Sequence, residues 1–310
     1  MTLLSPSEET KPAAAAMRLF CFGLGFTASA VAAAVHGATA RVAGTARSQE
    51  AASALAARGF EAFAFDGAAP MKNAQEVLAG ATHVLISVPP DADGDPVLRC
   101  HGGDLVRLLS AARSLRWVGY LSTTAVYGDR GGEWVDEETP CAPTSARAER
   151  RLAAETTWLD LHREQGLPVH IFRLAGIYGP GRNALAEARR GTARRIHKPG
   201  QVFSRIHVED ITQVVLASMA RPNPGRVYNV CDNEPAPGED VVAHAFQLIG
   251  QKPPPAVPFE KAAAGLSEMA RSFYADNKRV RNDRIKRELG VILRYPSYRI
   301  GLEALLAGGE

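Results

Sequence analysis

A glycine-rich segment near the start of the chain constrains the fold more than any other feature. The apolar run "MRLFCF" leads into "GLGFTA", in which Gly23, Gly25 and Ala28 have the spacing GxGxxA, and an alanine-rich stretch follows. Gly23 permits a tight turn, Gly25 lets the backbone approach a pyrophosphate, and Ala28 lets a helix pack close to the strand. The first amides of that helix, around Phe26 and Thr27, would face the phosphates. The segment predicts a dinucleotide-binding turn between a strand and a helix.

Short apolar runs alternate with helix-like segments over residues 17–173. Runs such as "ATARVAG", "ATHVLISV" and "RWVGYLS" are each followed by a segment typical of a helix, and a long one covers about residues 145–165. This alternation predicts right-handed βαβ units around a parallel sheet with helices on both faces. We therefore predict an α/β fold with a Rossmann-type doubly wound parallel sheet in residues 17–173.

The rest of the chain is less regular. Turns such as "YGPGRN", "RPNPGR" and "NEPAPGED" separate short helices and strands. We predict a smaller, mixed α/β substrate-binding region in residues 174–310, with some elements returning to the sheet. Residues 1–16 are polar and alanine-rich, and they lack the basic and apolar parts of a signal peptide. We expect them to form a disordered tail.

Composition excludes several other classes of protein. The chain has 310 residues, 46% of them hydrophobic, which is ample for a buried core. The formal net charge of +3 is too small to indicate a nucleic-acid or membrane partner, and no apolar run reaches the roughly 18 residues that span a bilayer. The four cysteines are scattered, with no CxxC pair and no zinc-like spacing. We expect a cytoplasmic protein without a metal site.

The end of the second predicted strand distinguishes between two dinucleotides. A site for NAD has Asp or Glu about 20 residues after the glycines, where it accepts a hydrogen bond from the ribose 2′-hydroxyl. Here the strand ends "VAGTARSQE", and Arg47 is the first charged residue. A guanidinium can bind a 2′-phosphate, which a carboxylate would repel. We predict NADP as the cofactor, with NAD as the alternative, place Arg47 at the 2′-phosphate and include Ser48 among the cofactor-binding residues. The alternative for Arg47 is a solvated residue at the start of a helix.

Other cofactor contacts are expected at the carboxyl ends of later strands, where ligands of such sheets bind. Asp66 follows the third strand and is placed to meet the adenine, with an ordinary turn aspartate as an equal alternative. Val88 and Pro89 lie at the end of the fourth strand. Ala175 and Ile177, after the strand "PVHIFRL", complete the predicted cofactor set.

Four motifs in this order carry a resemblance to a known family: "GLGFTA", "LSTTAVYGD", "FRLAGIYGPGR" and "SRIHVEDI". Together they resemble the extended short-chain dehydrogenase/reductase family of nucleotide-sugar epimerases and dehydratases, from about Met17 to Leu306. Within it, the chain is most similar to an atypical branch described as NAD-dependent epimerase/dehydratase-like. The resemblance implies a Rossmann domain that binds NAD(P) and a C-terminal region that binds substrate.

The same resemblance implies a catalytic Ser or Thr at the end of the fifth strand, which is Thr123 here, and a Tyr-x-x-x-Lys pair on the next helix. Alignment on "LAAE" puts the tyrosine position on Arg147 and the lysine position on Arg151. Arginine keeps its proton in proteins, so neither residue can act as the acid/base. Arg151 can still donate to the nicotinamide ribose and also belongs to the predicted cofactor set, as does Thr123. Arg147 can only stabilise an anion. Tyr127 is a weak candidate for a replacement acid/base.

Candidate substrate residues follow in the C-terminal region. Tyr178 and His207 are titratable groups near expected loop ends, and packing around the site is the more common role of both. Arg182 and Asn183 begin a basic stretch that suits a substrate diphosphate or carboxylate, with a solvated basic surface as the alternative.

Two functions from different classes remain open at this point. The first is an NADP(H)-dependent oxidoreductase, epimerase or dehydratase acting on a small polar substrate, for example a nucleotide sugar. The second is a non-catalytic NADP(H)-binding protein that uses cofactor occupancy as a regulatory signal, because the motifs for cofactor binding are present while the usual acid/base is absent. A homodimer is a further possibility in either case.

Overall fold

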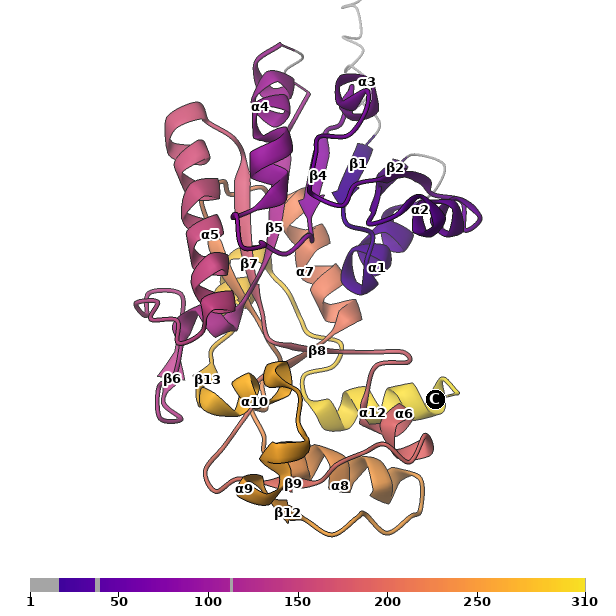
Figure 1. Ribbon diagram of the computed structural model, residues 1–310, viewed down its shortest axis with the longest axis vertical. Helices are drawn as coiled ribbons and strands as arrows, with labels where there is room; N and C mark the ends of the chain where they lie inside the picture. The colour runs from indigo at the N-terminus through magenta and orange to yellow at the C-terminus, as the bar shows by residue number, and fades with distance from the viewer. Residues whose placement is uncertain (1–16, 37–39, 112–113, 310) are drawn as a thin grey trace, which may run out of the picture.

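A seven-stranded parallel sheet forms the upper half of the protein in the computed structural model, which describes residues 17–36, 40–111 and 114–309 (Figure 1). The predicted tail, residues 1–16, lies outside the described residues. The strand order is β11-β7-β5-β4-β1-β2-β3, and all pairings are parallel. The strands are β1 (Met17–Phe22), β2 (Ala40–Ala46), β3 (Glu61–Ala64), β4 (His83–Ile86), β5 (Trp117–Thr123), β7 (Val169–Leu174) and β11 (Val227–Val230). The predicted Rossmann-type fold is confirmed.

Helices cover both faces of the sheet. Successive residues of a strand point to opposite sides of the sheet, so each strand contributes side chains to both layers. On β1, Leu19 and Cys21 belong to one buried cluster, which includes residues of α1 (Phe26–Val35), α2 (Gln49–Ala56), α7 (Val208–Ala220) and α11 (Asp283–Leu289). Phe20 and Phe22 belong to the other, with residues of α3 (Ala74–Leu78), α4 (Pro96–Ala111) and α5 (Ala146–Gln165). The sheet therefore lies between two apolar layers.

The strand order reverses direction between β1 and β4. From β1 the chain adds β2 and β3 on one side, and then β4, β5, β7 and β11 on the other. In open sheets of this kind, ligands bind in the crevice outside the carboxyl ends of the strands at that reversal. The loops after β1, β2 and β4 are thus the expected place for a ligand.

Shorter elements form the lower half in Figure 1 and the connections to it. Three two-stranded sheets pair β8 with β10, β9 with β12 and β6 with β13. Their bounds are β6 (Trp134–Val135), β8 (Gly176–Tyr178), β9 (Ile196–His197), β10 (Arg205–His207), β12 (Val257–Pro258) and β13 (Arg279–Val280). The helices are α6 (Ala184–Arg189), α8 (Gly238–Leu248), α9 (Phe259–Ala262), α10 (Glu268–Ala275) and α12 (Tyr298–Ala307), with 3-10 turns η1 (Thr124–Tyr127) and η2 (Ala263–Gly265).

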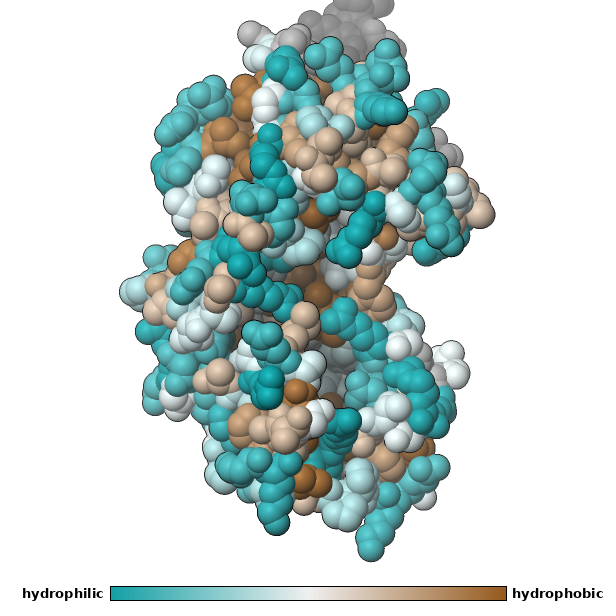
Figure 2. Space-filling view, in the orientation of Figure 1, coloured by the Kyte–Doolittle hydropathy of each residue, from teal (hydrophilic) through white to brown (hydrophobic). Residues whose placement is uncertain are grey.

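The C-terminal part of the chain contributes to both halves. A third buried cluster, with Leu185, Ala245 and Leu302 among its members, joins α6, α8 and α12. In contrast, β11 is an edge strand of the central sheet, and α7 contacts α1. Figure 2 shows the surface hollowed between the two halves.

Candidate functional site

The glycine-rich turn after β1 has the geometry that a bound pyrophosphate requires. Gly23 has a φ of +86°, and a Cβ there would lie 3.1 Å from Cγ2 of Val88. Its amide donates to Thr45 Oγ1 at 2.8 Å, which ties the turn to β2. At Gly25, the residue before α1, a Cβ would have no heavy atom within 4 Å. The space above Gly25 is therefore open, and the first amides of α1 have no intrahelical acceptor.

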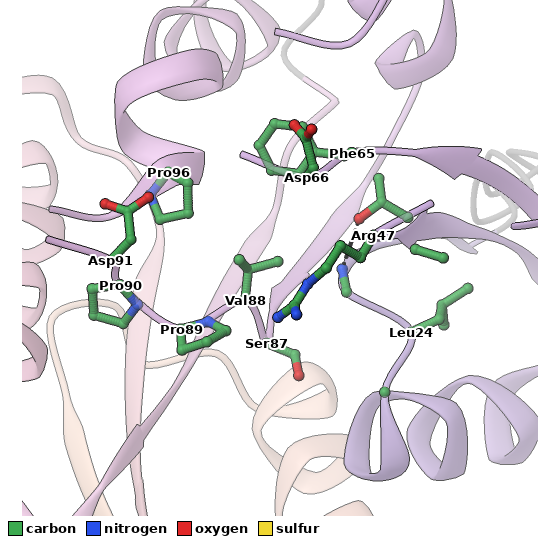
Figure 3. A pocket seen from close by; sticks show the side chains of 14 residues that line it. Leu24, Arg47, Phe65, Asp66, Ser87, Val88, Pro89, Pro90, Asp91 and Pro96 are labelled. Carbon is green, nitrogen blue, oxygen red and sulfur yellow. Dashed lines mark hydrogen bonds between the residues drawn. The ribbon is translucent and has the colours of Figure 1, made fainter. Parts of the chain in front are cut away.

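A cavity of about 440 Å³ lies beside this turn. Figure 3 shows its lining, with the Arg47 side chain pointing into it. The lining comes from the loops after β1, β2, β3 and β4: Gly23, Leu24, Gly25, Thr45, Ala46, Arg47, Phe65, Asp66, Ser87, Val88, Pro89, Pro90, Asp91 and Pro96. We call it the Arg47 cavity.

Six of the predicted cofactor residues line the Arg47 cavity: Gly23, Gly25, Arg47, Asp66, Val88 and Pro89. Asp66 Oδ1 accepts a hydrogen bond from the amide of Ala68 at 2.9 Å, as a turn aspartate does. Ser48 does not line the cavity and caps α2, where its hydroxyl accepts from the amide of Ala51.

The other predicted cofactor residues lie next to the Arg47 cavity or further away. Phe26, Thr27 and Ala28 begin α1, and Thr27 and Ala28 are buried. Ala175 is buried after β7, where its amide donates to the carbonyl of Val230. Ile177 lies on β8 and lines a different cavity.

Several lining residues were not predicted from the sequence. Thr45 holds the glycine-rich turn through its hydroxyl, and Phe65, Ser87 and Asp91 complete the wall. Their position at the carboxyl ends of β2, β3 and β4 was the available signal, because ligands bind at those ends.

Arg151 is anchored at the end of β5. Its Nη1 donates to the carbonyl of Leu121 at 2.8 Å and to the hydroxyl of Tyr120 at 3.2 Å. The residue is only 8% exposed, although no carboxylate pairs with it among the described residues. Arg147, one turn earlier on α5, keeps much of its surface exposed, and the burial of the remainder together with the charge of Arg151 lowers its pKa. The two cations thus lie near each other on α5.

Thr123 and Tyr127 differ in what surrounds their hydroxyls. Thr123 is partly buried at the end of β5, and its Oγ1 accepts from the amide of Ala125. Tyr127 is fully buried, donates to Asn229 Oδ1 at 2.7 Å and accepts from Arg173 Nη1 at 3.0 Å. Burial raises the pKa of Tyr127 to about 12. Its hydroxyl therefore joins β7 and β11 in the core, and this arrangement does not favour an acid/base role.

A buried ion pair extends this network. Arg173 Nη2 donates to Glu155 Oε2 at 2.8 Å, and the Ser122 hydroxyl also donates to Glu155. Glu155 is 1% exposed and Arg173 7%. Because removing one partner of a buried pair leaves an uncompensated charge, this network fixes α5 against β5 and β7, and with them the position of Arg151.

His207 is a buried neutral residue in this structure. Its Nδ1 accepts from the amide of Glu209 at 3.2 Å at the start of α7, and its ring packs against those of Tyr178 and Tyr295. Burial lowers the pKa of His207 to about 4. The burial of His207 argues for a role in packing, although the sequence had suggested a substrate role.

The remaining three predicted substrate residues come together in a second cavity of about 210 Å³, which we call the Arg205 cavity. It shares no lining residue with the Arg47 cavity. The lining residues are Ile177, Tyr178, Arg182, Asn183, Ala184, Glu187, Arg205, Val241, Tyr298 and Leu302. Arg205, Val241, Tyr298 and Leu302 were not predicted, because they lie far from the others along the chain.

Arg182 links the Arg205 cavity to the glycine-rich turn. Its guanidinium carbon lies 5.6 Å from the ring centroid of Phe26, the first residue of α1. Asn183 caps α6, where its Oδ1 accepts from the amide of Ala186 at 2.9 Å, and its Nδ2 donates to the carbonyl of Gly179. Through Arg182, the lining of the Arg205 cavity thus contacts the first residue of the helix that follows the glycine-rich turn.

A doubly wound parallel sheet with a GxGxxA turn and a cavity at its strand reversal defines a Rossmann-type protein. The model of the NAD dependent epimerase/dehydratase family matches residues 23–231. The chain belongs to this family, which confirms the resemblance to epimerases and dehydratases.

Three known proteins show how far the similarity extends. Protein YeeZ of Escherichia coli (strain K12) is 32% identical over 184 residues, which are 58% of this chain and 63% of YeeZ, so less than two thirds of that relative is matched. A functionally unknown conserved protein from Silicibacter pomeroyi DSS has a solved structure with 54% identity and a TM-score of 0.84, covering 95% of this chain and 99% of that one. The dTDP-glucose 4,6-dehydratase of Bacillus anthracis str. Ames, solved in complex with NAD, has a TM-score of 0.74 at 18% identity, covering 95% and 98%. The last similarity shows the fold alone.

A membrane-spanning helix and a metal-binding cluster are both absent from residues 17–36, 40–111 and 114–309. No helix there combines the length and the apolar character needed to cross a membrane. No group of three or more His, Cys, Asp or Glu side chains is arranged to hold a metal ion.

Proposed function

We propose that the chain is an NADP(H)-binding oxidoreductase, or a nucleotide-sugar epimerase/dehydratase-like enzyme, that acts on a small polar substrate. One observation carries the cofactor proposal. Arg47 points into the Arg47 cavity from the end of β2, and no hydrogen bond or ion pair occupies its guanidinium among the described residues. An unpaired guanidinium at the ribose end of the site suits a 2′-phosphate.

The residues around the Arg47 cavity fit a dinucleotide. Open space above Gly25 and the free amides of α1 suit the pyrophosphate, whose negative charge the positive end of the helix favours. Asp66 and Phe65 lie at the far side of the cavity and suit the adenosine. When bound, NADP(H) supplies the hydride acceptor or donor.

The protein side of the chemistry is less complete. Arg147 and Arg151 stay protonated, so they can orient groups or stabilise an anion but cannot exchange a proton. We assign Arg151 to the nicotinamide ribose and Arg147 to an anionic group of the substrate. Thr123, at the end of β5, supplies a hydroxyl that can donate a hydrogen bond to a substrate carbonyl.

The cofactor proposal is tested by comparing the affinities of NADPH and NADH. We expect NADPH to bind more tightly, and Arg47→Ala to weaken NADPH binding about ten- to a hundredfold, because a hydrogen bond to a charged group contributes roughly 1.5–3 kcal/mol. Binding of NADH should change little. The control is Arg41→Ala, an exposed arginine on the same strand and outside the cavity. An unchanged preference in Arg47→Ala would show that Arg47 does not read the phosphate.

A second function has its own support. The absence of a proton-exchanging residue at positions 147 and 151, together with the buried hydroxyl of Tyr127, favours a non-catalytic NADP(H)-binding protein that reports cofactor occupancy. Adding candidate nucleotide sugars and small carbonyl compounds to the NADPH complex separates the two. Consumption of NADPH supports the enzyme, whereas stable binding with no turnover supports the regulatory protein.

We also propose that the protein acts in the cytoplasm and forms a homodimer. Gel filtration with light scattering tests the assembly. A monomer at micromolar concentration would contradict it.

A further inference from the structure

The Arg205 cavity is built from five elements. Tyr178 comes from β8, Glu187 from α6, Arg205 from β10, Val241 from α8 and Leu302 from α12. Its volume of about 210 Å³ corresponds to roughly seven molecules of liquid water. A ligand that fills it is therefore much smaller than a nucleotide.

Arg205 carries a charge that no carboxylate contacts directly among the described residues. Its Nη1 donates to the carbonyls of Phe203 at 2.8 Å and Ala236 at 3.0 Å, and no carboxylate pairs with it in the described part of the chain. Burial lowers the pKa of Arg205. A partly buried cation held only by neutral carbonyls is costly unless an anion compensates it.

The nearby carboxyl group of Asp232 attracts Arg205 but compensates its charge only in part. Asp232 is 1% exposed, and its Oδ2 has no hydrogen-bond partner among the described residues. Burial raises the pKa of Asp232 to about 8 and so favours the protonated, neutral form of this carboxyl.

A second polar group of the cavity also lacks a partner. Tyr298 is 1% exposed and lines the cavity, and its hydroxyl has no hydrogen-bond partner among the described residues. The guanidinium carbon of Arg205 lies 5.9 Å from the centroid of the Tyr298 ring. Buried hydroxyl groups normally have a hydrogen-bond partner, so this one indicates a missing acceptor.

The other walls limit the kind of anion. Ile177, Val241 and Leu302 present aliphatic side chains, and Glu187 adds a carboxyl group to the lining. Arg182 and Glu187, which carry opposite charges, both line the cavity, so Arg205 supplies the net positive charge of the lining, which suits a singly charged carboxylate. The apolar walls favour a ligand whose body is a short hydrocarbon.

We propose that the Arg205 cavity binds a small carboxylic acid with a compact apolar body, whose carboxylate lies between Arg205 and the Tyr298 hydroxyl. Binding at this site does not depend on the proposed function, but the identity of the acid as the small polar substrate does. The alternative is that the same acid is an effector rather than a substrate. Arg182, which lines the cavity and packs on Phe26, would connect either one to the cofactor turn.

The test is calorimetric titration of the full chain, without cofactor, with isovalerate and with its neutral isostere isovaleramide. We expect isovalerate to bind at least tenfold more tightly. Arg205→Gln should abolish this preference, and Tyr298→Phe should weaken isovalerate binding about fivefold. The matched control is Arg189→Gln, an exposed arginine of α6 outside the cavity, which should leave both affinities unchanged.

Equal binding of the acid and the amide by the wild type would overturn the proposal, as would an intact preference in folded Arg205→Gln. If Arg205→Gln does not fold, Tyr298→Phe decides, because it removes only a hydroxyl that has no hydrogen-bond partner among the described residues. Unchanged isovalerate affinity in that variant would then overturn the proposal.

A second arm separates a substrate from an effector. The keto acid 3-methyl-2-oxobutanoate is added to the NADPH complex, and loss of NADPH is followed. Oxidation of NADPH that Arg205→Gln abolishes identifies a substrate, and binding without oxidation identifies an effector; both results support the site. Failure of the protein to bind NADPH would contradict the proposed function and leave the isovalerate result standing.

Discussion

At the residue scale, the positions that the sequence predicts best are those whose role depends on the backbone. Gly23 and Gly25 occupy the turn and the open space assigned to them, because each needs only the absence of a side chain. Gly44 could not be predicted in this way. A Cβ at Gly44 would lie 2.6 Å from the carbonyl oxygen of Cys21, a contact that exists only once β1 and β2 pair. The role of Tyr127 could not be predicted either, because its hydrogen-bond partner Asn229 lies 102 residues away along the chain.

Gly25→Val tests the pyrophosphate contact at this scale. A Cβ at this position meets no heavy atom within 4 Å, so the variant should fold, with a loss of about 1 kcal/mol for a poor helix cap. The side chain would fill the space that we assign to the pyrophosphate, and NADPH affinity should fall by more than about tenfold. Gly25→Ala should give a smaller loss. Retained affinity in folded Gly25→Val would place the pyrophosphate elsewhere.

At the element scale, prediction succeeds where an element carries its own signals. The helix expected at about residues 145–165 is α5 (Ala146–Gln165), with Ser145 accepting from the amide of Ala148 and Gly166 ending it in the left-handed conformation. The pairs β9 with β12 and β6 with β13 contain two residues per strand. They carry too little pattern to be recognised, and their partners lie far apart along the chain.

Arg151 on α5 tests how this element meets the cofactor. Arg151→Ala should weaken NADPH binding about tenfold, because the ribose loses a charged donor and the end of β5 loses its anchor. Arg151→Lys should recover part of the affinity, since one donor returns. Arg163→Ala, on the exposed end of the same helix, is the control and should match the wild type. Wild-type affinity in Arg151→Ala would exclude the ribose role.

At the scale of the whole molecule, the sequence indicates the layers but not how they are joined. Apolar runs and helix patterns predict a sheet covered on both faces, which the two large clusters confirm. The return of β11 to the sheet edge, and the polar network that holds it through Asn229, depend on contacts between distant segments. The Arg205 cavity has the same origin, because five separate elements form it.

Buried histidines should make the stability of the whole molecule depend on pH. Burial lowers the pKa of His83, His170 and His207 to about 4, against 6.5 normally. Between these values the unfolded chain binds more protons, so their contribution to stability falls as pH drops from about 6.5 to 4, by about 2 kcal/mol each at pH 5. The pKa of Asp232 is raised to about 8, so its contribution to stability changes in the opposite direction and falls as pH rises toward 8.

Comparison of variants isolates the contribution of one histidine to the pH dependence of stability. His170→Gln should lose less stability than the wild type between pH 7 and pH 5, measured by urea unfolding. His36→Gln, at an exposed position, should follow the wild type. Equal pH dependence in His170→Gln and the wild type would mean that His170 is not held neutral by burial.

The central claim is that the Arg47 cavity is built for a 2′-phosphate, and fragments of the cofactor test it most directly. Calorimetric titration with 2′,5′-ADP and with 5′-AMP isolates the contribution of that phosphate, without the nicotinamide. The account predicts that 2′,5′-ADP binds about ten- to a hundredfold more tightly to the wild type, and that Arg47→Ala removes most of the difference. Equal affinities of the wild type for the two fragments would contradict it.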